Sequence, residues 1–316
     1  METLLKKIAE SGTIAIIGHL NPDGDCVGSC LGLYNYITDV YPEKQADVFL
    51  EVPQKKFSLL RGYDRIRHRA DAGMESYDLV CCLDCADGSR MGRFLPVFEK
   101  AAFSYCVDHH ITNAGYADCN LIQPDASSTS EIIYDLLDDG KIGTETAACL
   151  YLGIAHDTGV FRYNCTSERT MEAAGRLMTK GIDHVEILDR TFYQKSLAQR
   201  RAFAAALSSA EITLGGKVIV SVFTWQNMKE TGVEAADLDG IVSELRDTDG
   251  VDTSVFIYQT GEDEFKVSLR SRDLVDVSRI AAGHGGGGHK KAAGCNIRGT
   301  KDEILRIITE EIKEQF

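Results

Sequence analysis

The sequence predicts an α/β fold in two domains, and three observations carry this prediction. The chain has 316 residues, which corresponds to two domains at about 150 residues each. Its first half alternates short apolar runs with longer helical patterns, and this alternation is typical of a parallel sheet. Beyond residue 183 the pattern changes, and further strand-like runs lead to a glycine cluster at 283–288. We therefore expect a parallel-sheet domain over 1–184, a helical linker over 185–211 and a smaller α/β domain with a mixed sheet over 212–316.

The first domain contains the clearest elements. Short runs rich in β-branched residues predict strands at 13–18, 46–52, 78–83 and 103–107. Helical periodicity predicts helices at 25–39, 130–138, 144–156 and 167–180, the last ending at Gly181 as a C-cap. The opening residues 1–12 predict a polar amphipathic helix and not a signal peptide.

The second half of the chain begins with a segment that has almost no turn residues. Residues 185–211 carry a charged run at 195–201, and we interpret the whole segment as one connecting helix. Strands are expected at 217–224, 253–259 and 264–270, with a helix near 234–246. Thr300 and Glu303 form a capping box, which predicts a last helix that runs to the end of the chain.

Composition excludes several classes of function. With 44% hydrophobic and 26% charged residues, the chain matches a packed globular protein. Its formal charge of −14 argues against electrostatic capture of long nucleic acid, so handling phosphates would need a local cation. No apolar stretch approaches the roughly 18 to 20 residues of a membrane span. We expect a cytoplasmic protein.

The ten cysteines lack the spacing of a secreted disulfide framework, and several lie inside apolar runs, as reduced core cysteines do. Cys82 and Cys85 form one CxxC pair. Zinc would need a second pair to complete four ligands, so core packing is the favoured interpretation of this pair.

Histidines and aspartates fall directly after the predicted strands, where an open parallel sheet binds its ligands. These residues are His19, Asp23 and Asp25 after the first strand, Asp84 after the third, and Asp108, His109 and His110 after the fourth. Asp157 follows an apolar helix. So many carboxylates in one crevice would repel one another, and bound cations would remove that cost. Imidazoles mixed with carboxylates suit manganese, magnesium or iron, and two such ions are the arrangement that hydrolyses phosphoesters.

These residues also carry a family resemblance. The first domain resembles the DHH phosphoesterase superfamily in His19-Leu-Asn-Pro-Asp23-Gly-Asp25 with Gly28-Ser29, Leu83-Asp84, Asp108-His109-His110 and His156-Asp157-Thr158-Gly159. The second resembles the DHH-associated substrate-binding domain in Gly285-Gly-Gly-Gly-His289 and Ala292-Ala293-Gly294. Among its members, the chain is most similar to the stand-alone bacterial oligoribonucleases that also act as 3′-phosphoadenosine 5′-phosphate phosphatases.

The resemblance implies a site with two divalent ions, foremost Mn²⁺, with Mg²⁺ or Fe²⁺ as alternatives. One ion would be held by His19, Asp23 and Asp84, and the other by Asp25, Asp84, His109 and Asp157. Asp84 would bridge them. His110 would face the substrate phosphate or the leaving oxygen, and Asp108 would orient the histidines. Gly24 and Gly28 would permit a tight loop and a close helix approach around these ligands.

Substrate contacts are expected mainly in the second domain. The glycines Gly286, Gly287 and Gly288 would let backbone amides approach a phosphate beside His289. Arg270, next to Ser271, is the candidate for a bidentate phosphate contact, against the alternative of a solvated arginine. In the first domain Arg90 could line the cleft, and Ser128 could receive phosphate or simply cap a helix. The chain has Gly283 and His284 where the family commonly has a bulky aromatic residue, which leaves the packing of this loop open.

The function that the resemblance implies is hydrolysis of very short oligonucleotides to mononucleotides and of 3′-phosphoadenosine 5′-phosphate to AMP. The substrate would lie between the two domains. A cyclic-dinucleotide or linear-dinucleotide phosphodiesterase is the alternative, since the same resemblance covers relatives with that activity. Pyrophosphatase activity fits less well, because the family members that have it carry a different second domain without the glycine run. Processive exonuclease activity also fits less well, because the members that have it are usually longer, with added nucleic-acid-binding parts. If the chain were a non-catalytic nucleotide sensor, metal ligands of the family motifs would be missing, whereas all of them are present in the sequence. A homodimer is expected from the resemblance.

Overall fold

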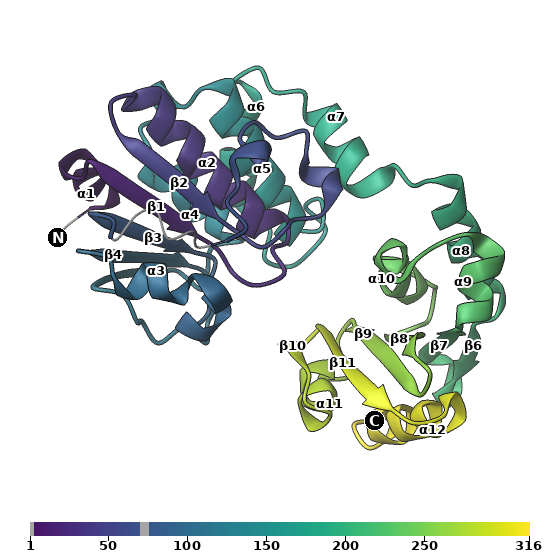
Figure 1. The fold of residues 1–316 in the computed structure, drawn as a ribbon. Coiled ribbons are helices and arrows are strands. Elements are labelled where there is room, and N and C mark those ends of the chain that lie inside the picture. The colour runs from purple at the N-terminus through teal and green to yellow at the C-terminus, as the bar shows by residue number, and fades with distance from the viewer. Residues whose placement is uncertain (1–2, 70–75) are drawn as a thin grey trace. The chain divides into compact units, whose positions relative to one another are not determined.

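The computed structural model describes residues 3–69 and 76–316, and the chain divides into two compact units, Met1–Gln194 and Lys195–Phe316. Each unit has its own sheet with helices packed on it (Figure 1). The boundary between the units falls inside the predicted linker.

The sheet of the first unit is parallel throughout, as the sequence predicts. Its strand order is β2-β1-β3-β4-β5. The strands are β1 Thr13–Ile17, β2 Gln45–Phe49, β3 Leu79–Leu83, β4 Ser104–Asp108 and β5 Cys119–Ile122. The first four match predicted strands. The fifth, β5, was not predicted, because it is a four-residue edge strand that is only half-buried.

Helices cover both faces of this sheet (Figure 1). They are α1 Leu4–Glu10, α2 Gly24–Val40, α3 Leu95–Glu99, α4 Thr129–Leu136, α5 Thr144–Asp157 and α6 Glu168–Met178. Along β1, Ile14 and Ile16 pack on the side of α2, α4 and α5. Ile17, the last residue of β1, points to the opposite side of the sheet. There it is covered by Met91 and Phe94 of the 3₁₀ segment Gly88–Phe94, which precedes α3. Residues 1 and 2 of the predicted opening helix lie outside the described residues.

A close contact between α2 and α5 brings two parts of the future site together. A Cβ atom on Gly28 would lie 2.6 Å from the backbone oxygen of Cys149 and 2.8 Å from the backbone nitrogen of Gly153. Only glycine permits this approach. The contact places the start of α2 near the end of α5, where Asp157 is the last residue.

The connection between the units is not the single continuous helix that the sequence predicts. It contains α7 His184–Leu188, a π-helical turn at Asp189–Tyr193, and α8 Leu197–Ser208. Gln194 is extended, and Ser196 starts a new helix, because its hydroxyl accepts from the amide of Gln199 while the Gln199 side chain accepts from the amide of Ser196. This capping box lies in the charged run and starts α8 after the break at Gln194.

The second unit has a mixed sheet of order β10-β11-β9-β8-β7-β6, in which only β7 and β8 pair in parallel. The strands are β6 Glu211–Thr213, β7 Val218–Phe223, β8 Thr253–Gly261, β9 Glu264–Ser271, β10 Gly287–His289 and β11 Ala292–Arg298. The helices of this unit beyond α8 are α9 Trp225–Thr231, α10 Ile241–Arg246, α11 Val277–Gly283 and α12 Lys301–Lys313. The α10 helix is shorter than predicted because Gly240 adopts a left-handed conformation and interrupts it.

Two separate cores stabilise this second sheet. One face packs against α11 and α12, the other against α8, α9 and α10. The predicted capping box at Thr300 and Glu303 is present at the start of α12.

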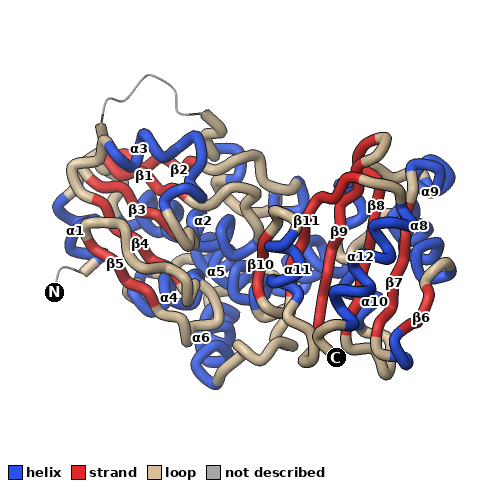
Figure 2. The backbone as a smooth tube through the Cα atoms, turned by 90° about the horizontal axis from the view of Figure 1, so that it is seen from below, coloured by secondary structure: helices blue, strands red, loops and turns tan. Residues whose placement is uncertain are grey.

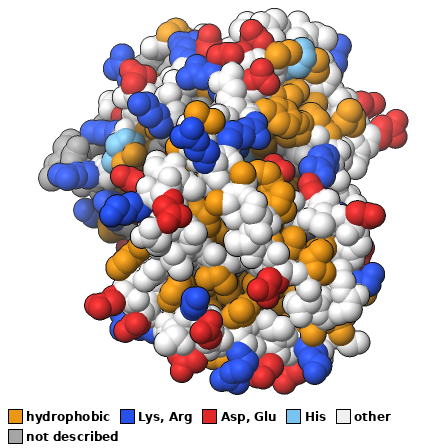
Figure 3. All heavy atoms as spheres, turned by 90° about the vertical axis from the view of Figure 1, so that its right-hand side faces the viewer, with side chains coloured by type: hydrophobic (Ala, Val, Ile, Leu, Met, Phe, Trp, Pro, Cys, Tyr) orange, Lys and Arg blue, Asp and Glu red, His pale blue; other side chains and the backbone are white. Residues whose placement is uncertain are grey.

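In the part of the chain that the structure describes, no helix has the length and apolar character needed to cross a bilayer. Acidic and basic side chains are interspersed with apolar ones over the face drawn in Figure 3.

Candidate metal centre

The predicted metal ligands of the first unit meet at the carboxyl ends of β1, β3 and β4. Among residues 3–69 and 76–316, four groups of three side chains have ligand atoms within 4.8 Å of one another. The groups are His19 with Cys26 and Asp84, Asp84 with His109 and His110, Asp23 with His156 and Asp157, and Asp25 with His109 and Asp157. Because the groups share Asp84, His109 and Asp157, they form one continuous cluster.

His19 presents one defined ring nitrogen to this cluster. Its Nδ1 lies 2.7 Å from the backbone oxygen of Leu20, which identifies Nδ1 as the protonated nitrogen. Nε2 then carries the lone pair, and it lies 3.7 Å from Asp23 and 3.4 Å from Asp84. A backbone carbonyl that fixes the tautomer in this way is common for metal-binding histidines.

Asp23 and Asp25 flank the first residue of α2. Asp23 is the N-cap and accepts hydrogen bonds from the amides of Asp25 and Cys26, both at 3.1 Å. Asp25 is fully buried, and its two oxygens accept from the amides of Thr129 at 2.7 Å and Ser130 at 2.9 Å. The start of α4 therefore orients a carboxylate that belongs to α2.

Asp84 is central in the cluster and has an unusual backbone. It follows β3 with a φ of 57°, in the left-handed region that aspartate tolerates better than most residues. Its carboxylate lies 3.4 Å from Nε2 of His19 and 3.6 Å from Nε2 of His109. Thr129 donates its hydroxyl to the same carboxylate at 3.1 Å. This position suits a ligand shared by two ions.

His109 joins Asp84 to Asp157, whose carboxylate lies 3.2 Å from Nε2. Burial alone would lower the pKa of His109, but the hydrogen bond that its ring donates to Asp157 and the charge of Asp84 outweigh burial and raise the pKa to about 11. His156 also contacts Asp157, at 3.7 Å. The surrounding carboxylates therefore favour positive charge at this position, which a bound cation would also supply.

His110 is held by a separate partner. Its Nδ1 lies 2.7 Å from the buried carboxylate of Asp108, which also accepts from the Asn113 amide at 2.7 Å. Burial would lower the pKa of His110, yet this bond and the charge of Asp84 raise it. Asp108 therefore contacts His110 and keeps its imidazole in one orientation.

The chemistry of this donor set fits divalent cations. It combines imidazole nitrogens with carboxylate oxygens, a mixture that suits manganese, magnesium or iron. Burial, together with the charges of Asp84 and Asp157, raises the pKa of Asp25 well above its usual range. Cations would relieve this repulsion. Cys82 and Cys85 are both buried and belong to none of the four groups found among the described residues.

The two substrate candidates of the first unit differ in placement. Arg90 lies on the 3₁₀ segment before α3, with its guanidinium 3.4 Å from Nδ1 of His19. Ser128 is fully buried, and its hydroxyl accepts from the amide of Glu131 as the N-cap of α4. Since the amides of Thr129 and Ser130 already bind Asp25, this placement favours the capping role of Ser128 over phosphate contact.

The candidates of the second unit gather around β10 and β11. His289 pairs with Ala292, and Ala292 pairs with Arg270. Ser271, in contrast, is buried and donates its hydroxyl to Asp252 at 3.2 Å, so its placement serves the core.

The glycine run is part of the sheet, since Gly287 and Gly288 belong to β10. A Cβ on Gly286 would lie 2.2 Å from the backbone oxygen of Gly294, and Gly288 has a φ of 143°. His284, before the run, lies 2.9 Å from Glu311 of α12. This contact joins the start of the glycine run to α12.

Sequence reasoning missed three residues that support the cluster: Thr129, Asn113 and Cys26. Thr129 donates to Asp84 from a helix 45 residues further along the chain. Asn113 donates to Asp108 from the segment just after Asp108-His109-His110. Only the fold shows these two contacts. Cys26 had a signal in the sequence, since it directly follows Asp25.

Comparison with known proteins bears on the whole chain. Residues 13–154 match the model of the DHH family, N-terminal domain, and residues 215–314 match the DHHA1 domain. A bifunctional oligoribonuclease and PAP phosphatase NrnA from Thermus thermophilus is 29% identical over 98% of this chain and 91% of its own length. A probable protein of the same name from Streptococcus mutans is 30% identical over 93% of each chain.

A solved structure gives the same picture of the fold. The crystal structure of an exopolyphosphatase-related protein from Bacteroides fragilis is 26% identical, with a TM-score of 0.91 over 98% of this chain and 94% of that one. The two matched domains, the relatives of similar length and the cluster at the strand ends agree, and this chain belongs to the DHH family of phosphoesterases.

Proposed function

We propose that this enzyme hydrolyses very short oligoribonucleotides to mononucleotides and converts 3′-phosphoadenosine 5′-phosphate to AMP. The observation that carries the proposal is the cluster of imidazoles and carboxylates at the ends of β1, β3 and β4. The names of its relatives, bifunctional oligoribonuclease and PAP phosphatase, support this choice of substrates.

In this proposal two divalent ions, foremost Mn²⁺, occupy the cluster. His19, Asp23 and Asp84 would hold one ion, and Asp25, Asp84, His109 and Asp157 the other. The distances of 3.4 Å from His19 to Asp84 and 3.2 Å from His109 to Asp157 support these two sets. When bound, such ions activate water for attack on phosphorus and stabilise the charge that develops there.

His110 has the role of proton donor to the leaving oxygen. Its bond to Asp108 commits Nδ1, so Nε2 is the nitrogen that meets the substrate. The contact with the buried Asp108 carboxylate at 2.7 Å stabilises a protonated imidazole, which is the form that an acid needs. Asp108 orients His110 and stabilises its charge.

Arg270 and His289 bind a substrate phosphate in the second unit, with Gly287 and Gly288 beside them. The predicted contact of the Gly286 amide does not fit, because this amide donates to the backbone oxygen of Ala281 at 2.8 Å. The alignment of Arg270 and His289 across three adjacent strands supports a shared ligand. Arg90 is the corresponding candidate beside His19. A chain with a net charge of −14 has little general attraction for long nucleic acid, which favours short substrates gripped at a few points.

We also propose a homodimer in the cytoplasm. All ten cysteines are present as thiols and not as disulfides in the described residues, which is typical of a reducing compartment. Light scattering of the purified protein tests the dimer, and a monomeric mass would reject it.

The decisive experiment is product analysis by chromatography. The purified protein is incubated with Mn²⁺ and, in parallel, with the dinucleotide pApA, 3′-phosphoadenosine 5′-phosphate and cyclic di-AMP. We expect rapid release of AMP from the first two. Preferential loss of the cyclic substrate would instead assign the enzyme to signal turnover, and no hydrolysis of any of the three would reject the proposed substrates.

A further inference from the structure

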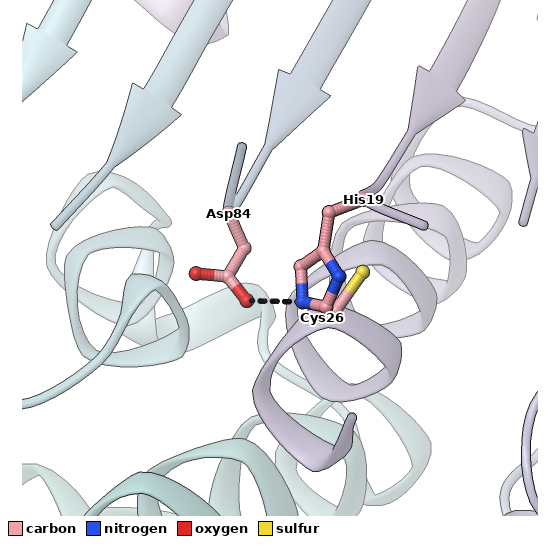
Figure 4. A group of neighbouring side chains, drawn as sticks. All are labelled: His19, Cys26 and Asp84. Carbon is pink, nitrogen blue, oxygen red and sulfur yellow. Dashed lines mark ion pairs between the residues drawn. The ribbon is translucent and has the colours of Figure 1, made fainter. Parts of the chain in front are cut away.

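A cysteine lies inside the metal cluster, at a position that the predicted ligand set does not include. The Cys26 sulfur, one ring nitrogen of His19 and one oxygen of Asp84 all lie within 4.8 Å of one another. Figure 4 shows the three side chains coming from α2, from the end of β1 and from the end of β3. Atoms this close can share one ion with only small adjustments, since metal–ligand bonds measure about 2.0–2.3 Å.

The backbone around Cys26 holds the thiol in this position. Cys26 lies in the first turn of α2, and its amide bonds to the capping carboxylate of Asp23 at 3.1 Å. The sulfur packs against Gly18, where an added Cβ would lie only 2.3 Å from it. The cysteine is fully buried. Gly18 therefore leaves the space that the sulfur occupies beside His19.

We propose that Cys26 is a thiolate ligand of the ion that His19 and Asp84 hold. On binding, the S–H bond breaks, the proton passes to solvent, and the sulfur forms a bond to the ion. This inference rests on the metal site of the proposed function but not on its substrates. A thiolate favours softer ions such as Fe²⁺, Co²⁺ or Zn²⁺ over Mg²⁺, so Cys26 biases the metal preference of this enzyme.

Two other cysteines provide matched comparisons. Cys30 lies one turn further along α2, is equally buried, and also faces Gly18, with an added Cβ 3.2 Å from its sulfur. It belongs to none of the metal-capable groups within the described ranges. Cys165 is exposed, and its thiol donates to the backbone oxygen of Asp157 at 3.7 Å. Variants of these two residues separate ligation by Cys26 from effects of any nearby thiol.

The first test is the absorption spectrum of the full chain loaded with Co²⁺. Thiolate ligation gives an intense sulfur-to-cobalt charge-transfer band in the near ultraviolet, which nitrogen and oxygen ligands do not give. We expect the band in the unmodified protein, in Cys30→Ser and in Cys165→Ser, and its loss in Cys26→Ser. A band that survives in Cys26→Ser, or no band in the unmodified protein saturated with Co²⁺, would overturn the proposal.

A second measurement needs no variant. X-ray absorption of the unmodified Zn²⁺-loaded protein should show sulfur at about 2.3 Å from zinc, at about one sulfur for every two ions. A first shell of nitrogen and oxygen alone would reject the ligand.

A third test compares two ions. In competition with a chromogenic chelator, Cys26→Ala should weaken Cd²⁺ binding by about tenfold or more and Mn²⁺ binding much less. Equal weakening of both ions would point to packing only. Each readout is independent of hydrolysis, so failure of the proposed substrates would leave it unchanged.

Discussion

Arg270 and His289 lie on the same face of the C-terminal sheet, on either side of Ala292. His289 pairs with Ala292 and Ala292 with Arg270, and directly opposed residues of antiparallel strands point to one face. The three strands β10, β11 and β9 run side by side in Figure 2. At about 4.8 Å per strand, the two backbones are about 10 Å apart. Two long side chains at that spacing can converge on one phosphate group.

Replacing Arg270 by alanine should raise KM for pApA about 10- to 100-fold, the usual effect of losing a charged hydrogen bond. The kcat should change little, because the reacting groups lie in the first unit. Arg270→Lys should recover only part of the loss, since lysine cannot make the bidentate contact. Steady-state kinetics check this prediction. Arg298→Ala, at an exposed position of β11, is the control and should leave KM unchanged.

Asp84→Asn should reduce hydrolysis by more than about 100-fold, since even the outer partners of metal ligands contribute 10- to 100-fold. Asparagine tolerates the φ of 57° at this position, so the fold should persist. Asp84→Ala should lose the same activity and additionally about 1 kcal/mol of stability from the left-handed backbone. Activity and urea unfolding of both variants check this. Near-normal turnover in Asp84→Asn would remove Asp84 from the centre of the site.

Ser128→Ala tests whether this hydroxyl caps a helix or binds phosphate. The structure gives it the capping bond to the amide of Glu131. We expect a loss of about 1 kcal/mol in the free energy of unfolding, with KM unchanged. Ser167→Ala, which removes the equivalent cap of α6, should lose a similar amount. An increase in KM for Ser128→Ala alone would instead favour phosphate contact.

Asp252 should make the second unit sensitive to acid. Burial would raise the pKa of its carboxyl, but hydrogen bonds from the amides of Asp273 and Leu274 and from the Thr253 and Ser271 hydroxyls lower the pKa below the usual 3.8. A carboxylate with a lowered pKa stabilises the fold fully above the unfolded value and progressively less as pH falls through the folded value.

The stability difference between the unmodified protein and Asp252→Asn should therefore be largest near neutral pH and decrease below about pH 4. Urea unfolding at several pH values measures it. The exposed Asp249→Asn is the control. A difference that stays constant down to pH 3 would contradict the assigned cause.

Gly28→Ala should destabilise the protein, although alanine normally stabilises a helix by about 1 kcal/mol relative to glycine. The new Cβ would lie under 3 Å from backbone atoms of α5, and such overpacking costs about 1–3 kcal/mol. Gly175→Ala, in α6 with open space around it, should show the opposite sign. Thermal unfolding of the pair checks this prediction.

The parallel sheet and the candidate ligands of the first unit could be predicted because both depend on local pattern. Apolar runs mark β1, β3 and β4, and polar residues directly after them must share one edge of the sheet. The strand β5 was missed because it is short and only half-buried, without a clear alternation. The break before Ser196 was missed because a reciprocal cap competes with helix continuation inside a sequence of good helix formers.

The roles of other candidate residues could not be predicted, because they depend on partners from distant segments of the chain. Ser128 looked equally suited to phosphate and to capping until the fold placed Asp25 on the neighbouring amides. Ser271 looked like a neighbour of Arg270, the arginine proposed to bind phosphate, but it faces Asp252 in the core. In both cases the residue type fits two roles, and the tertiary contact decides between them.

The bond between Asp25 and the amide of Thr129 spans 104 residues of chain, and this has a consequence during synthesis. A ribosome that has released only α2 has delivered a carboxylate without the amides that orient it. The ligand set is complete only when Asp157 at the end of α5 has also emerged. Binding of both proposed ions therefore cannot precede the emergence of Asp157, and a chain that terminates before this residue lacks one of the proposed ligands.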